Sequence, residues 1–259
     1  MSDLVSLCVT SYNRPSLLKS CIESFFLTNT YPLDRLELVI VDNGSTDVRV
    51  LDYINSLNPP CLDFKKVLNE KNDYPYCLRR AKNQARSVAA GDYFIDCPDD
   101  HLFVLKSNWI GETISYLSKE PAKISCVCHY SYPLYRFAKA NNKMFPSPIS
   151  DLYYVSELKG YADYHLMSKA AYEDIGAYRE DLEWSPNSES EYMHRSFAQG
   201  YKRALLKYPA SIINEGSCFL DLPITPSFYT SSFPTPFRPV DFEILTRLLR
   251  DQGHISPIS

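Results

Sequence analysis

Two short apolar segments that end in polar residues constrain the fold of this chain most. Residues 4–10 (LVSLCVT) and 36–42 (LELVIVD) are rich in branched side chains. Continuous apolar runs of this length are typical of parallel strands that are covered on both faces. Residues 15–27 lie between them, begin with a proline and carry apolar residues at helical spacing, namely Leu17, Leu18, Cys21, Ile22 and Phe25. The sequence therefore predicts a strand–helix–strand unit.

The same alternation continues along the chain. We expect further strands at residues 64–68, 93–96, 124–129 and 202–208, and helices at about 77–90, 107–119, 168–175 and 188–199. This alternation favours an α/β fold with a doubly wound, mostly parallel, Rossmann-like sheet flanked by helices.

Two segments depart from this alternation. Residues 131–160 show no clear period and are expected to form a long loop or lid. Residues 217–239 are rich in proline, and a final amphipathic helix is expected at about 240–251. We therefore predict a single domain over residues 1–215 and a Pro-rich C-terminal extension over residues 216–259.

Composition excludes several functional classes. Hydrophobic residues make up 45% of the 259 residues, charged residues 22%, and the net charge is -4, so a nucleic-acid partner is not expected. Neither GxGxxG nor GxxxxGK[ST] occurs, which argues against Rossmann dehydrogenases and P-loop NTPases. The first residues lack the basic leader of a signal peptide, and no run approaches the ~20 apolar residues of a membrane span. We expect a cytoplasmic protein, with peripheral membrane association from the cytoplasmic side left open.

Polar residues follow three of the predicted strands, at residues 10–14, 42–47 and 97–101. Ligands of doubly wound sheets lie at the carboxyl ends of the strands, so these residues are expected to share one pocket. Asp99 and Asp100 can hold a hard divalent cation whose open positions accept phosphate oxygens. An Asp-Asp pair alone is more typical of a solvated turn, but its position after an apolar strand favours the metal site.

Five segments together resemble the family-2 glycosyltransferases of the GT-A fold: VTSYNRP, VIVDNGSTD, AKNQARSVAAGDYFIDCPDDH, GAYRE and SESEYMHRSFAQGY. The resemblance covers about the first 215 residues, and the metal motif is nearest the spore-coat polysaccharide type. It implies a GT-A-like fold with a nucleotide-binding half at about 1–105 and an acceptor half at about 106–215. It also implies inverting transfer of a sugar from a nucleotide-diphosphate donor, with UDP favoured, to a saccharide or glycolipid hydroxyl in polysaccharide or glycoconjugate biosynthesis.

The resemblance assigns roles to matching residues. Thr10 and Tyr12 are expected to line the base, Asp42 to bind the base or ribose, Asp99 the ribose, and Asp100 a Mn2+ or Mg2+ ion on the diphosphate. Further residues are expected to contact the nucleotide-sugar: Arg14, Arg79, Asn83 and Asp163. The chain departs from the family at Pro98, where a third acidic residue is usual.

The catalytic base is expected near the last predicted helix. In the family, this carboxylate lies six residues before an arginine, which points to Glu189 when counted back from Arg195. Glu191 is the rival, although it stands four residues before Arg195, the spacing of a helical ion pair.

Two alternative functions remain at this point. Pro98 and the Glu in place of the usual Asp keep open a catalytically silent nucleotide-sugar-binding protein. A nucleotidyltransferase also pairs acidic residues with a metal, but it would normally carry a basic Gly-rich loop near the N-terminus, and this chain has none.

Overall fold

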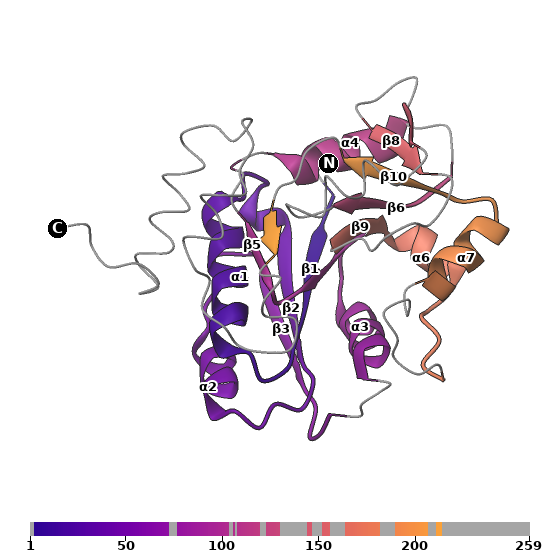
Figure 1. Ribbon diagram of the computed structural model, residues 1–259. Coiled ribbons are helices and arrows are strands. Elements are labelled where there is room, and N and C mark those ends of the chain that lie inside the picture. The colour runs from indigo at the N-terminus through magenta and orange to yellow at the C-terminus, as the bar shows by residue number, and fades with distance from the viewer. Residues whose placement is uncertain are drawn as a thin grey trace, which may run out of the picture.

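β1 (Val5–Ser11) lies between β2 (Leu36–Asp42) and β4 (Tyr93–Pro98), and β3 (Asp63–Leu68) follows β2 (Figure 1). All four strands are parallel. Every residue of β1 and β2 is buried, as expected for strands covered on both faces. The computed structural model describes residues 3–72, 77–103, 106, 108–119, 123–129, 144–146, 152–155, 164–181, 190–206 and 211–213.

The second half of the sheet is mixed. β9 (Tyr164–Ser168) runs antiparallel between β4 and β6 (Ile124–His129), and β10 (Lys202–Leu206) runs parallel to β6. β8 (Leu152–Val155) and β7 (Met144–Pro146) complete the order β3-β2-β1-β4-β9-β6-β10-β8-β7. Separately, β5 (His101–Phe103) pairs antiparallel with β11 (Ser211–Ile213).

Helices cover both faces of the sheet. One apolar core contains residues of α1 (Pro15–Thr28), α2 (Val48–Ser56) and α4 (Trp109–Lys119). The other contains residues of α3 (Cys77–Val88), α6 (Lys169–Ile175) and α7 (Ser190–Ala198). A short 3-10 helix, Leu33–Arg35, precedes β2. The doubly wound α/β prediction is therefore confirmed, and within the described residues no helix is long and apolar enough to cross a membrane.

The structure corrects the prediction of a continuous loop or lid at residues 131–160. β7 and β8 lie inside that range, and β8 pairs antiparallel with β10. A short strand at the edge of a sheet is stabilised by partners distant in sequence, which a local pattern does not reveal. The Pro-rich segment and final helix expected in residues 216–259 lie outside the described residues.

Gly44 lies in the loop after β2 and supports a first testable prediction. Its φ is +80°, and a Cβ there would lie 2.2 Å from the backbone carbonyl carbon of Lys71. Gly44→Ala therefore adds backbone strain and a clash with the main chain, and we expect the free energy of unfolding to fall by about 2–5 kcal/mol in urea denaturation. Gly200→Ala is the matched control, since Gly200 has a φ of +82° but faces open space. An equal loss in both variants would contradict the packing argument.

Candidate functional site

The polar ends of β1, β2 and β4 meet at one edge of the sheet. Ser11 of β1 is in register with Asp42 of β2, and Thr10 is in register with Pro98 of β4. Because the three strands are parallel, the residues that follow them extend from the same edge. The structure thus brings together the three polar segments that the sequence placed at one pocket.

Asn13 holds the loop after β2 in place. It adopts a left-handed φ of 52°, and its Oδ1 accepts hydrogen bonds from the backbone N–H groups of Thr46 (2.8 Å) and Asp47 (3.0 Å). Its own N–H donates to Ser45 Oγ at 2.8 Å. The sequence reasoning did not single out Asn13, although asparagine is among the residues that tolerate this conformation.

The side chains of three predicted nucleotide contacts differ in their exposure. Asp42 is buried, and its carboxylate accepts from Ser45 N–H (2.9 Å) and Ser45 Oγ (2.5 Å). Thr10 is also buried, whereas 40% of Tyr12 is exposed. Tyr12 is therefore the most exposed of the three, and Asp42 holds the loop after β2 through Ser45.

The acidic pair after β4 faces a cation from the loop after β1. Asp99 is fully buried and forms an ion pair with Arg14, while Arg14 Nη1 lies 3.6 Å from Asp100 Oδ2. Burial raises the pKa of Asp99 to about 7, against the lowering effect of Arg14, and the negative charge of Asp100 raises it further. His101 Nε2 lies 3.8 Å from Asp100 Oδ1. Arg14 therefore compensates a pair of closely spaced carboxylates.

The residues present fit a metal ion that the protein and a substrate coordinate together, rather than one that protein side chains coordinate completely. No group of three His, Cys, Asp or Glu side chains suited to a metal ion occurs in the described part of the chain. Three carboxylate oxygens are buried and accept no hydrogen bond of normal geometry from described residues: both oxygens of Asp99 and Oδ1 of Asp100. The Asp99 carboxylate forms its ion pair with Arg14. Mg2+ and similar hard ions are commonly bound by one or two carboxylates plus substrate phosphates, which fits this donor set.

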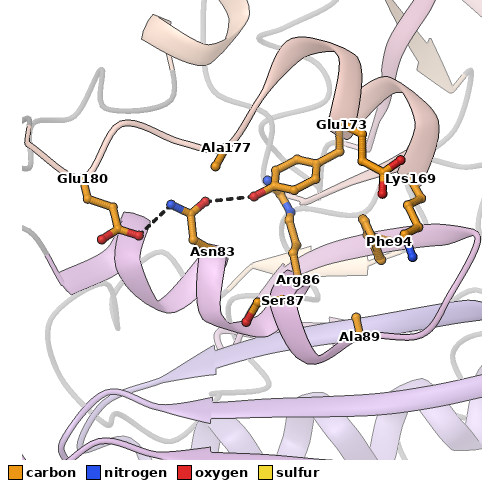
Figure 2. A pocket seen from close by; sticks show the side chains of 10 residues that line it. Asn83, Arg86, Ser87, Ala89, Phe94, Lys169, Glu173, Ala177 and Glu180 are labelled. Carbon is orange, nitrogen blue, oxygen red and sulfur yellow. Dashed lines mark hydrogen bonds between the residues drawn. The ribbon is translucent and has the colours of Figure 1, made fainter.

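Two predicted residues, Arg79 and Asn83, belong to α3, which packs in the second of the two apolar cores. Asn83 donates to Tyr178 O (2.9 Å) and Glu180 Oε1 (2.8 Å), and its Oδ1 accepts from Tyr172 OH and Tyr178 N–H, both at 3.1 Å. It lines a cavity of about 470 Å3 beside α6, where Figure 2 shows its bond to Glu180. Asn83 thus anchors the turn after α6 with its full hydrogen-bonding capacity.

The two arginines before Asn83 have different surroundings. Arg79 is buried, and the Arg80 Nε lies 3.5 Å from Glu180 Oε2. The role of Arg79 toward a nucleotide stays a prediction.

A buried ionic network around Asp96 was not predicted from the sequence. The Asp96 carboxylate lies 2.6 Å from Arg86 Nη2, 3.3 Å from His165 Nε2 and 3.6 Å from Lys82 Nζ. Tyr178 OH donates to it at 3.3 Å. Burial alone would raise the pKa of Asp96, but Arg86 and Lys82 hold it well below its ordinary value. The signal in the sequence is the basic pair Lys82 and Arg86, which stand four residues apart and so share one face of α3.

The late helix carries the ion pair that its spacing indicated. Arg195 donates from Nε to Glu191 Oε1 at 2.9 Å, and also to the backbone oxygens of Ile175 (2.6 Å) and Ala177 (2.8 Å). Glu191 thereby orients an arginine that caps α6. Glu189 and Asp163 lie outside the described residues, and α7 begins at Ser190, directly after Glu189.

Comparison with known proteins decides the family. The family model described as glycosyl transferase family 2 matches residues 6–176, which is more than half of the chain. This chain belongs to glycosyl transferase family 2. The match includes the ends of β1, β2 and β4, so the acidic pair and Arg14 lie inside the family region.

The curated relatives of this family-2 chain are longer than the chain. It is 30% identical over 134 residues to glycosyltransferase GlyG of Streptococcus pneumoniae, covering 51% of this chain and 41% of GlyG. It is also 30% identical over 129 residues to an uncharacterised protein of Acanthamoeba polyphaga mimivirus, covering 48% of this chain and 14% of that protein. This chain therefore spans less than half the length of either relative.

Solved structures support the same fold. The mannosyltransferase PcManGT from Pyrobaculum calidifontis, in complex with GDP-Man and Mn2+, superposes with a TM-score of 0.57 at 16% identity, covering 98% of this chain and 72% of that chain. S. aureus TarS 1-349 in complex with UDP gives a TM-score of 0.57 at 15% identity, with the same 98% and 72% coverage. At this level of identity the likeness establishes a GT-A-type architecture and no substrate.

Proposed function

We propose that this family-2 chain is an inverting glycosyltransferase that moves a sugar from a nucleotide-diphosphate donor, with UDP favoured, to a hydroxyl of a saccharide or glycolipid. The observation that carries the proposal is the acidic pair Asp99–Asp100 at the edge where β1, β2 and β4 end, within the family region. Polysaccharide or glycoconjugate biosynthesis in the cytoplasm, with peripheral membrane association, is the setting that we propose.

The nucleotide would bind across the ends of the first strands. The exposed ring of Tyr12 can stack on a base, and Thr10 lies next to it in the chain. Asp42 keeps acceptor capacity beyond its bonds to Ser45, and together with Asp99 it can accept hydrogen bonds from base or ribose. Arg14 adds a guanidinium, whose flat fork suits phosphate oxygens. Arg79 and Asn83 of α3 belong to the predicted nucleotide-sugar set, but Asn83 would first have to give up its bonds to the turn after α6.

Asp100, with Asp99 behind it, would hold Mn2+ or Mg2+ at the donor phosphates. The similar structures that contain GDP-Man with Mn2+, or UDP, support this part of the proposal. Such an ion supplies positive charge where the departing diphosphate gains negative charge.

The acceptor reacts on the side of the sugar opposite the diphosphate. Its hydroxyl oxygen forms the new bond to the anomeric carbon while the bond to the phosphate oxygen breaks, so the configuration inverts. The hydroxyl proton passes to a carboxylate, for which we propose Glu189, with Glu191 as the rival. Asp163 is proposed to contact the donor or the acceptor.

Thermal unfolding with nucleotides tests this function. A ligand at 100 times its Kd stabilises the folded state by about 2.7 kcal/mol, so the nucleotide with the lowest Kd raises the melting temperature most at equal concentration. We expect that nucleotide to be UDP rather than GDP or TDP, each measured with Mn2+. With a UDP-sugar and an acceptor, transfer of the sugar to the acceptor hydroxyl should release UDP. No shift with any nucleotide would contradict the proposal. Binding without turnover would favour the silent binding protein, and pyrophosphate release from a nucleoside triphosphate would favour a nucleotidyltransferase.

A further inference from the structure

Arg14 occupies the position at which a cation would meet the acidic pair. Its guanidinium contacts Asp99 and lies 3.6 Å from Asp100, so it compensates both carboxylates at once. Asp99 has no exposed surface, and only about a tenth of the Asp100 side chain is exposed. The guanidinium therefore lies against the carboxylate oxygens that a divalent ion would bind.

The backbone around Arg14 explains how its side chain reaches the pair. Arg14 is the residue before the first turn of α1, and Asn13 ahead of it is in the left-handed conformation. The turn joins the end of β1 to α1 and places the Arg14 side chain against the residues that follow β4. The guanidinium is carried by a flexible stem rather than by a strand or helix interior, and 19% of the side chain is exposed. The turn that carries Arg14 is held by the hydrogen bonds of Asn13 to residues 45–47.

The charges make Arg14 and a divalent ion competitors. Two carboxylates and one guanidinium carry at most about one net negative charge. A divalent ion added to that set would lie close to another cation, which is repulsive at such short distances. A diphosphate changes the balance, because it brings negative charge and because a guanidinium binds phosphate oxygens in bidentate fashion.

We propose that Arg14 closes the acidic pair to divalent cations until a nucleoside diphosphate draws the guanidinium away. Arg14 is then the residue that makes metal binding depend on the nucleotide. This inference deepens the proposed function and rests on it. Since linked binding is reciprocal, the metal and the nucleotide strengthen each other's binding, and Arg14 sets a part of that coupling.

The test measures Mn2+ binding directly, by calorimetry or electron paramagnetic resonance, on the full chain without nucleotide. We expect Arg14→Met to bind Mn2+ at least about tenfold tighter than the wild type, within the usual range of coupling between sites. We also expect UDP to increase the Mn2+ affinity by a smaller factor in Arg14→Met than in the wild type. Equal Mn2+ affinity in the two proteins without UDP would overturn the proposal.

Three further variants keep the test decisive. Arg14→Lys replaces Arg14→Met if that variant fails to fold, because it keeps a positive charge beside buried Asp99. It should give an intermediate Mn2+ affinity, because an ammonium lacks the planar, forked donor geometry of a guanidinium. Asp100→Asn in the Arg14→Met background should remove the gain. Arg49→Met is the matched control, since Arg49 forms an exposed ion pair with Asp47 at 2.6 Å, and it should bind Mn2+ as the wild type does.

The outcomes separate this inference from the function on which it rests. A wild-type chain that binds no nucleoside diphosphate would contradict the proposed function. An Arg14→Met chain that binds UDP but shows wild-type Mn2+ affinity would contradict only the role of Arg14. A gain in Mn2+ affinity that persists after Asp100→Asn would place the ion elsewhere and would also overturn the inference.

Discussion

Asp100→Ala is expected to abolish sugar transfer and to remove the Mn2+ dependence of UDP binding. Asp100 is the more accessible carboxylate of the pair, and its Oδ1 accepts no hydrogen bond from described residues. Alanine takes away the proposed metal ligand, and with it the positive charge that would stabilise the departing diphosphate. Steady-state transfer and UDP titrations with and without Mn2+ measure both effects.

The control for this experiment is Asp34→Ala. Asp34 is exposed in the short 3-10 helix before β2, at the opposite end of that strand from the polar residues, so the variant should retain transfer and Mn2+ dependence. Asp100→Ala must also keep the wild-type circular dichroism spectrum, since the loss has to come from the site rather than from unfolding. Unchanged activity in Asp100→Ala would mean that the acidic pair is only a turn after β4.

Glu189→Gln is expected to lower kcat by about 10²–10⁴-fold with nearly unchanged donor affinity, because a general base contributes that much. A carboxylate at the start of a helix is stabilised in its ionised form by the free N–H groups there, and α7 begins at the next residue, Ser190. Initial rates at saturating donor and acceptor, together with UDP titration, measure the two quantities separately.

Glu191→Gln is the paired variant and should act mainly on stability. Glu191 accepts from Arg195 at 2.9 Å, and Arg195 also binds the backbone at the end of α6. A neutral amide weakens that ion pair, so the melting temperature should fall while kcat changes little. If Glu191→Gln loses kcat and Glu189→Gln loses only stability, Glu191 is the base.

The sequence predicted the parallel half of the fold well because its strands are continuous apolar runs. The bounds expected for the second strand, 36–42, coincide with β2, and the first helix extends one residue beyond its expected end. α2 was missed although the sequence carries its signals: Val50 and Ile54, four residues apart, form its buried face, and Asp47 caps its first turn. β9 was missed because a five-residue strand inserted between β4 and β6 depends on partners far away in the chain.

The sequence predicted those residues of the candidate site that lie at the end of a strand or directly after it. The convergence of Thr10, Asp42 and Asp99 follows from parallel strands in one sheet and could be read from the sequence. The contact of Arg14 with the acidic pair could not, because it depends on the turn at Asn13. Likewise, the full hydrogen bonding of Asn83 depends on the turn after α6, which the sequence places about a hundred positions later.

The Asp96 network has a consequence for how this fold can be recombined. It joins Asp96 of β4 and the basic residues of α3 to His165 of β9 and to Tyr178, which follows α6. A chimera that takes residues 106–215 from another family member would leave Asp96, Arg86 and Lys82 facing foreign side chains. Breaking a buried charge cluster costs about 3–5 kcal/mol. An exchanged segment would therefore need to carry matching residues at positions 165 and 178, so this buried network limits where the fold can be recombined.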